Sequence, residues 1–339
     1  MLKAIIREPL KLKVIETEKP EAGKGEALIA LKNIGVCGSD LHVYHGVHPC
    51  TYYPITTGHE ISGVVEKLGE GVTGLKIGQP VTVMPQLFCG KCLPCRSGMY
   101  NICNELKVHG FQTEGVAAEW FAFPADMVMP LPDGLSFEEG AMMEPLAVAC
   151  HAIGRFGDVK GRKVAVLGAG TIGNLVAQAA LGMGAGTVLI SDVSDFRLRI
   201  AEECGIPFRT NSTREPFAEA YAAAFGPDGA DVMFECAGAQ QTLDDMLACA
   251  RKGSAVVIVA MYGKRPEVEM SHIQEHELTV IGTLMYRRED FVSAIGLLGG
   301  NKVQLARLIT HRFPFRDYEQ AYKKAAASKD DAMKVMIGV

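Results

Sequence analysis

Apolar and polar residues alternate in short runs over the first part of the chain. Up to about residue 153 these runs, such as 27–32, 61–66 and 80–84, are separated by glycine and proline. A period of two indicates half-buried strands, and glycine and proline mark the turns between them. This spacing predicts a compact antiparallel β-barrel over residues 1–153.

The pattern changes near residue 158, where apolar strands begin to alternate with helical patterns. The predicted strands are 164–167, 187–191, 232–235, 255–260 and 279–282, and the predicted helices are 171–183, 195–204 and 240–250. This alternation predicts a doubly wound parallel sheet, an α/β domain, over residues 154–290. Residues 291–339 add two amphipathic helices, 291–298 and 318–327, and a final strand, 334–338, which we expect to return to the first domain.

Length and charge place the chain among ordinary globular proteins. It has 339 residues, of which 48% are hydrophobic, and a net charge of −5. This length favours two domains, and the charge gives no reason to expect nucleic acid or an anionic membrane as a partner. The first residues lack a signal-peptide pattern, and no run reaches the ~18 apolar residues of a membrane span. We therefore expect a cytoplasmic protein.

The segment 164–192 carries a binding motif. An apolar strand leads into Gly168, Gly170 and Gly173, spaced as G-x-G-x-x-G, and Asp192 ends the next strand. Such glycines allow a tight turn, the approach of a pyrophosphate to the helix N-terminus and close packing of helix on strand. An acid ~20 residues further on meets the adenosine ribose. The motif predicts a bound dinucleotide, with a glycine-rich helix start as the alternative.

Four of the ten cysteines lie in one short loop. They are Cys89, Cys92, Cys95 and Cys103. Without a secretory signal a disulfide framework is not expected. Four thiolates complete the tetrahedral coordination of zinc and leave no open position, so this lobe, at about 86–106, is expected to hold a structural zinc. An iron–sulfur cluster or redox cysteines are the alternatives.

A second set of candidate metal ligands is dispersed along the sequence. Cys37 lies in G-V-C-G-S-D, His59 and Glu60 in G-H-E, and Glu144 before a proline. A thiolate, an imidazole and a carboxylate would suit a catalytic zinc, which keeps one position for water or substrate. Spacing alone does not show that these residues converge.

Taken together and in this order, the five motifs resemble those of the zinc-dependent medium-chain dehydrogenases over essentially the whole chain. Within that family the sequence is similar to the polyol and sugar-acid branch, which includes sorbitol, threonine and galactonate dehydrogenases. The resemblance implies a GroES-like β-barrel catalytic domain, a Rossmann domain, two zinc ions per chain, NAD, and a dimer or tetramer.

The resemblance also implies roles at the catalytic zinc. Cys37 and His59 would be ligands, and Glu144 a third ligand or a neighbour through water. Glu60 would be able to exchange onto the metal. Asp40 would orient His59 through its other ring nitrogen.

A proton relay is implied as well. Ser39 would take the proton of the substrate hydroxyl, and His42 would pass it to solvent through the nicotinamide ribose. An alcohol must lose this proton before a hydride leaves its carbon, and zinc favours the loss as a Lewis acid. The expected reaction is oxidation of a secondary alcohol in a small polyhydroxy substrate to a ketone, with hydride transfer to nicotinamide.

Several residues are expected at the cofactor. Asp192 favours NAD over NADP because a carboxylate accepts from the ribose hydroxyls and repels a 2′-phosphate. Arg197 is expected near adenine or ribose, or else is a solvated helix charge. The remaining expected contacts, which could equally be packing residues, are Thr171, Ile172, Val259, Ala260, Met261 and Thr283.

The substrate side is defined less sharply. The rings of His45, His48, Tyr52 and Tyr53 either bind a sugar chain or are exposed loop residues. Polyol and sugar-acid members often have an arginine two or three residues past the glycine matched by Gly282. This chain has Leu284 and Met285 there, and Arg287 and Arg288, which follow, are expected to be surface charges rather than substrate contacts.

Two other functions compete with a dehydrogenase. One is a metal-dependent lyase or hydrolase that retains NAD, and the other is a non-catalytic dinucleotide-binding protein on the same fold. The presence of Cys37, His59 and Ser39 favours the dehydrogenase.

Overall fold

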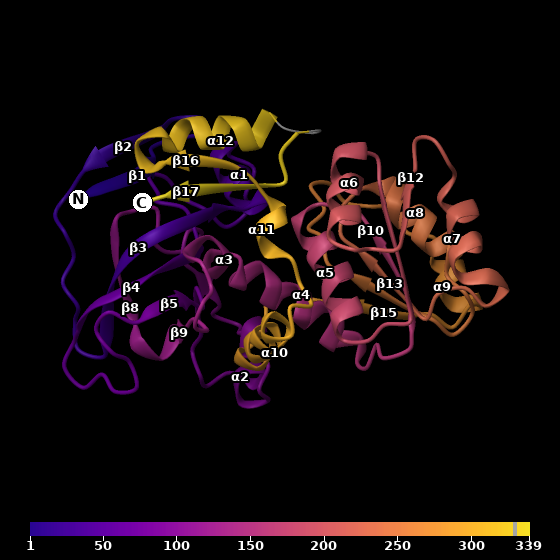
Figure 1. Ribbon diagram of the computed structural model, residues 1–339, viewed down its shortest axis with the longest axis horizontal. Helices are drawn as coiled ribbons and strands as arrows, with labels where there is room; N and C mark the ends of the chain where they lie inside the picture. Colours follow the sequence, from indigo (N-terminus) through magenta and orange to yellow (C-terminus); the bar gives the residue numbers. More distant parts are fainter. Residues whose placement is uncertain (328–330) are drawn as a thin grey trace. The chain divides into compact units, whose positions relative to one another are not determined.

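The structure is a computed structural model that describes residues 1–327 and 331–339 (Figure 1). The chain forms two compact units. The first comprises residues 1–144, 309–327 and 332–339, and the second comprises residues 145–308.

A seven-stranded sheet forms the framework of the first unit. Its order is β16 (Ile309–Pro314), β17 (Lys334–Gly338), β3 (Glu26–Val36), β4 (Glu60–Leu68), β5 (Pro80–Val83) and β9 (Val128–Pro130), and β8 (Trp120–Pro124) also pairs with β3. Only β16 and β17 run parallel. Ile29, Ile61 and Val81, one from each run that predicted a strand, are fully buried. The GroES-like, β-rich character expected of this unit is confirmed.

Smaller elements complete the first unit. They are β1 (Leu2–Ile6) with β2 (Leu12–Glu16), β6 (Gln86–Leu87) with β7 (Lys107–Val108), and the helices α1 (Gly38–Tyr44), α2 (Leu93–Arg96), α3 (Phe137–Ala141) and α12 (Tyr318–Ala327). In Figure 1 the yellow α12 and β17 lie beside the indigo strands at the other end of the sequence, and β17 pairs antiparallel with β3. Segments far apart in the chain therefore build this unit together.

The second unit contains a six-stranded sheet in which all neighbouring strands are parallel. Its order is β12 (Phe208–Asn211), β11 (Thr187–Asp192), β10 (Lys163–Leu167), β13 (Val232–Glu235), β14 (Ala255–Ile258) and β15 (Thr279–Gly282). This is the 3-2-1-4-5-6 order of a Rossmann fold, so the predicted doubly wound domain is confirmed. Its helices are α4 (Met143–Phe156, which starts in the first unit), α5 (Thr171–Gly182), α6 (Asp195–Glu203), α7 (Phe217–Phe225), α8 (Gln240–Cys249), α9 (Met270–Glu275), α10 (Arg288–Gly299) and α11 (Leu305–Leu308).

Several elements of this unit were missing from the sequence pattern, namely β12 and the helices α4, α7, α9 and α11. The strand β12 buries only Thr210 of its four residues, so it shows neither an apolar run nor an alternation. The helix α7 follows Pro216 and consists largely of alanine and aromatic residues, which show weak periodicity. Within the described part of the chain, no helix is long and apolar enough to cross a membrane.

Candidate active site

Cys37 lies at the junction between β3 and α1, where it is the N-cap of the helix. Its N–H donates to Oδ2 of Asp40 at 2.9 Å, because an acid at the third helical position can bond back to the N-cap. The Ser39 hydroxyl donates to the Cys37 sulfur at 3.1 Å. The start of α1 therefore holds a half-buried thiol with a hydroxyl beside it.

His59 and Glu60 lie where the chain enters β4. The residue before them, Gly58, has φ = +90°, a conformation that glycine adopts without strain. Oδ1 of Asp40 accepts from the Gly58 N–H at 3.2 Å and lies 3.4 Å from Nδ1 of His59. Burial alone would raise the pKa of Asp40, but His59 and the backbone N–H groups of Cys37 and Gly58 lower it. An ionised Asp40 thus orients the imidazole ring.

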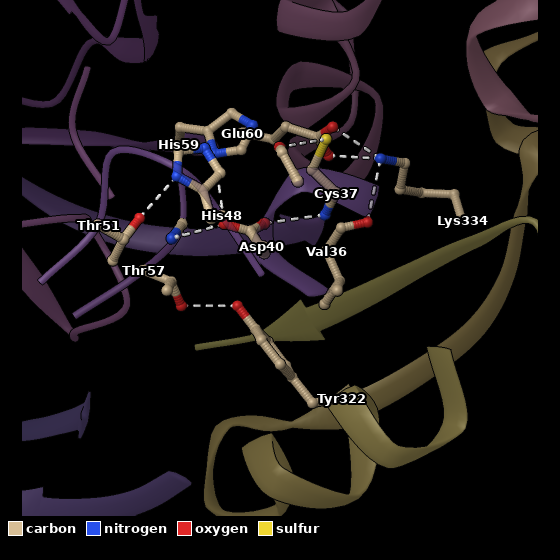
Figure 2. A network of polar contacts seen from close by, with 12 residues as sticks. Val36, Cys37, Asp40, His48, Thr51, Thr57, His59, Glu60, Tyr322 and Lys334 are labelled. Carbon is tan, nitrogen blue, oxygen red and sulfur yellow. Dashed lines mark hydrogen bonds and ion pairs between the residues drawn. The ribbon is translucent and has the colours of Figure 1, made fainter. Parts of the chain in front are cut away.

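These residues bring three candidate metal ligands together. Ligand atoms of Cys37, His59 and Glu60 all lie within 4.8 Å of one another (Figure 2). A thiolate, an imidazole and a carboxylate at this spacing can reach one zinc ion, and three protein ligands leave one position open. The residues present therefore fit a catalytic zinc.

Glu60 also forms a buried ion pair with Lys334, the first residue of β17. The ammonium lies 2.7 Å from both carboxylate oxygens of Glu60. Burial would lower the pKa of Lys334, but the carboxylate of Glu60, with further contributions from Cys37 and Glu144, raises it overall. Lys334 is therefore a permanent cation beside the candidate ligands.

Glu144 is buried in the first turn of α4. Its charge reaches Lys334, but its carboxylate is outside the cluster of Cys37, His59 and Glu60. Of the two carboxylates expected near the metal, Glu60 is the one that the structure brings into this cluster. His42 lies one turn after Ser39 on α1.

The four lobe cysteines also converge. Sulfur atoms of Cys89, Cys92, Cys95 and Cys103 lie within 4.8 Å of one another. Backbone N–H groups donate to two of them, from Cys89 and Glu105 to the Cys103 sulfur at 3.3 Å and from Cys92 to the Cys89 sulfur at 3.4 Å. Backbone N–H groups of Asn104 and Cys95 lower the pKa of Cys92 to about 6. This donor set fits a closed, four-thiolate zinc site.

The three glycines of the nucleotide motif have distinct surroundings. A Cβ on Gly168 would lie 2.9 Å from the Ala237 nitrogen, and one on Gly173 would lie 1.8 Å from the Gly168 oxygen, whereas a Cβ on Gly170 would meet nothing within 4 Å. Two glycines are thus required by packing, and the third faces open space at the N-terminus of α5. This arrangement fits a pyrophosphate approaching the backbone.

Asp192 is held beside this loop at the end of β11. Its carboxylate accepts from the N–H groups of Ala169 at 2.7 Å and Ser194 at 2.9 Å. Arg197, on the first turns of α6, lies 3.6 Å from it. The expected pair of ribose-binding residues is therefore assembled next to the glycine loop.

The residues expected at the nicotinamide follow the strands β14 and β15. Val259 and Ala260 each donate a backbone N–H to the backbone carbonyl oxygen of Glu235, at 2.9 and 3.0 Å. Met261 is more than half exposed. Oγ1 of Thr283 is buried and has no hydrogen-bond partner among the described residues, which leaves a polar group available to a ligand.

Among the rings expected on the substrate side, that of His48 is the one placed towards a candidate metal ligand. Its ring stacks on Phe111 at 4.6 Å between centroids, and Phe111 contacts His59 at 5.0 Å. Tyr53 donates its hydroxyl to the Val43 oxygen, and His45 and Tyr52 are exposed.

Arg287 is half-buried at the N-cap of α10, with its guanidinium 3.9 Å from Asp290. Arg288, the first residue of α10, is exposed. Their expected role as surface charges stays a prediction.

Two residues of the site were not identified from sequence. Lys334 begins an apolar strand, and a lone lysine at a strand start is ordinarily exposed. Phe111 lies in a loop without periodicity. The pairing of β17 with β3 is what brings Lys334 to Glu60.

Comparisons with known proteins agree with this geometry. Residues 23–133 match the family described as "Alcohol dehydrogenase GroES-like domain", and residues 171–299 match "Zinc-binding dehydrogenase". The chain is 36% identical to a sorbitol dehydrogenase of Halalkalibacterium halodurans, over 96% of this chain and 94% of that protein. It is 35% identical to a 2-dehydro-3-deoxy-L-galactonate 5-dehydrogenase of Pseudoalteromonas atlantica, over 91% and 90%.

A solved structure has the same fold. It is a zinc-binding dehydrogenase of Sinorhizobium meliloti bound to NADP, with a TM-score of 0.92, 30% identity, and coverage of 100% of this chain and 99% of that one. The chain therefore belongs to the zinc-dependent medium-chain dehydrogenases, in their polyol and sugar-acid branch, and is an oxidoreductase of CH–OH groups that uses zinc and a nicotinamide dinucleotide.

Proposed function

We propose that the protein oxidises a secondary alcohol of a polyol or sugar acid to the ketone and transfers the hydride to NAD. The observation that carries this proposal is the cluster of Cys37, His59 and Glu60, with the Ser39 hydroxyl 3.1 Å from the Cys37 sulfur. A metal-binding cluster with a hydroxyl beside it suits alcohol oxidation, because the hydroxyl proton must leave as the hydride is transferred, and a metal makes that proton more acidic. The names of the relatives support a polyhydroxy substrate.

Each residue of the cluster has a distinct role in this reaction. When bound, zinc supplies a Lewis acid that makes the substrate hydroxyl more acidic. Cys37 and His59 hold the metal, and Asp40 keeps the ring of His59 in orientation. Ser39 takes the hydroxyl proton as it hands its own proton on, so that the relay adds no charge beside the metal, and His42, one turn further along α1, passes the proton to solvent.

The second unit supplies the cofactor site. The pyrophosphate binds at Gly170, where a Cβ would meet nothing within 4 Å at the N-terminus of α5. Asp192 accepts from the ribose hydroxyls, with Arg197 beside it, and this carboxylate favours NAD over NADP. Thr171 and Ile172 follow Gly170, and the nicotinamide is bound by Val259, Ala260, Met261 and Thr283.

The test is NADH formation, followed by absorbance, over a panel of polyols, aldonates and amino alcohols, together with the zinc content of the purified protein. We expect two zinc ions per chain and NADH formation with at least one secondary alcohol. A protein that turned over a hydroxy compound without net NADH would instead be the lyase or hydrolase. A protein that bound NAD tightly but converted none of the panel would contradict the proposal.

We also propose that the protein is a cytoplasmic homo-oligomer. The strand β15 lies at the edge of its sheet, and Val280 on it is 49% exposed; an unpaired edge can pair with the same edge of a second copy. All ten cysteines are free thiols in the structure, and thiolate zinc sites persist best in a reducing compartment. A monomer in analytical ultracentrifugation at micromolar concentration would contradict the oligomer.

A further inference from the structure

The Lys334–Glu60 pair is among the most buried ion pairs of the described chain. Lys334 is 3% exposed and Glu60 is 1% exposed. The ammonium donates to Oε1 and Oε2 of Glu60, both at 2.7 Å, and to the Val36 oxygen at 3.2 Å. These three contacts use all three N–H groups of the ammonium. Both oxygens of the carboxylate are engaged by a single cation.

Strand pairing fixes this geometry. Val335, next to Lys334, is opposite Val36, and Gly35 is opposite Glu60. A Cβ on Gly35 would lie 2.1 Å from Oε2 of Glu60, so the carboxylate occupies the space that any larger residue would fill. Figure 2 shows both oxygens of the Glu60 carboxylate bound to the Lys334 ammonium. Glu60 therefore has little freedom to leave the pair by side-chain rotation alone.

Two cations would compete for this carboxylate. One is Lys334, and the other is the metal that Cys37, His59 and Glu60 are spaced to hold. Glu144 is a second carboxylate near enough for its charge to act on Lys334. With Glu60 on the metal, Cys37, His59 and Glu60 would be three protein ligands; with Glu60 held by Lys334, the position that Glu60 would take stays open to water or substrate.

We propose that Lys334 is a positioning residue that retains Glu60 off the catalytic metal and so keeps one coordination position open. This inference rests on the proposed function, because it requires a catalytic zinc at Cys37 and His59. A buried ammonium bound to both oxygens makes Glu60 a poor ligand while leaving it within reach of the metal. Removal of the ammonium leaves the metal as the remaining cation near a buried carboxylate, which is costly to leave unpaired.

The test is Lys334→Met, which removes the charge but keeps a long side chain. After addition of a chelator, we expect zinc to leave the catalytic site more slowly by about 10-fold or more, and kcat to fall by at least a similar factor. Replacement of a residue that contacts a metal ligand typically changes metal affinity or activity by about 10–100-fold. In the cobalt-substituted protein, the visible absorption bands should change, because a carboxylate enters the coordination shell. Loss of packing alone would lower both zinc retention and kcat. Higher zinc retention together with a lower kcat therefore identifies the positioning role.

A second variant tests whether the carboxylate of Glu60 is the cause of the slower zinc release. Lys334→Met combined with Glu60→Gln should return zinc release to the native rate or faster, since no carboxylate is left to bind. If Lys334→Met does not fold, Lys334→Gln removes the charge while keeping a hydrogen-bond donor. The matched control is Arg312→Met on the neighbouring β16, whose ion pair with Glu138 at 2.7 Å is exposed; it should leave zinc release and kcat unchanged.

Zinc that leaves at the native rate or faster from Lys334→Met, with unchanged cobalt bands, would overturn the inference. A native protein that contains only one zinc per chain and forms no NADH would instead contradict the proposed function. These outcomes are distinct, because the zinc-release experiment compares variants that all bind zinc at the catalytic site.

Discussion

Replacement of Asp192 by asparagine should change the preferred cofactor. The carboxylate is only 8% exposed and lies beside the glycine loop, where it accepts from Ala169. Asparagine has the same shape but no charge, so it would no longer repel a 2′-phosphate. It would also free Arg197, now 3.6 Å away, to approach that phosphate.

The size of the effect follows from the charges. Two unit charges about 4 Å apart interact by about 4 kcal/mol at the effective dielectric constant near a protein surface, which corresponds to nearly 10³ in relative rate. Solvent near the carboxylate weakens this repulsion. We therefore expect the ratio of kcat/KM for NAD to kcat/KM for NADP to fall by at least about 10². Asparagine also loses an acceptor for one backbone N–H, which should lower the free energy of unfolding by about 1–3 kcal/mol.

The assay is initial-rate kinetics with each cofactor on the same alcohol. Asp195→Asn is the control, because Asp195 starts α6, the helix that carries Arg197, but pairs with Arg214 and Asn211 at the surface. A native-like ratio of the two cofactors in a folded Asp192→Asn protein would refute the reasoning, since it would mean that this carboxylate does not face the ribose.

Three further predictions concern the metal sites, the proton relay and the second unit. Cys37→Ser should abolish turnover and leave one zinc per chain, with a nearly native unfolding temperature. Cys95→Ser should also leave one zinc per chain but should unfold at a lower temperature, because the lobe has little core of its own. If metal analysis and calorimetry gave the same zinc content and the same unfolding temperature for both variants, the roles of the two sites would be wrongly assigned. Ser39→Ala should lower kcat by about 10²–10⁴ with native NAD affinity by fluorescence titration, and a native kcat would exclude the hydroxyl from the relay. Burial would raise the pKa of Asp231, but the Lys163 N–H and Arg251 lower it, so the ionised carboxylate stabilises the fold, and this contribution is lost as the pH falls through the lowered pKa. In chemical denaturation, Asp231→Asn should therefore be about 1–2 kcal/mol less stable than the native protein at pH 7. The deficit should begin to shrink only below 3.8, the unperturbed pKa, and should vanish below the lowered pKa; an equal deficit at pH 7 and at the lowest pH would contradict this.

The Rossmann unit was largely predictable because its strands are buried on both faces. A strand such as β10, with four of five residues buried, produces a continuous apolar run that stands out from the helices around it. The strand β12, at the sheet edge, buries one residue and produces no such run. The strand β15, at the other edge, buries none of its residues but was recognised because three of its four residues are β-branched. Burial made the central strands recognisable, whereas an edge strand could be recognised only where its residues themselves favour a strand.

The candidate site was predictable only where its chemistry is local in sequence. Cys37 and His59 lie in short motifs with glycine on both sides or before them, and the lobe cysteines are close neighbours in the chain. Lys334 lies 274 residues from Glu60, and no local pattern distinguishes it from a lysine that merely begins a strand. Its role depends on two strand pairings that only the folded chain reveals.

The late position of β17 has a consequence for biosynthesis. The segment of β3 near Val36 is complete long before Lys334, 298 residues further along, is translated. During that interval the nascent sheet exposes an open edge that invites pairing with other chains, and the acidic side chain of Glu60 has no neutralising partner. The metal centre is thus expected to reach its final form only after residue 334 has been translated and β17 has paired with β3.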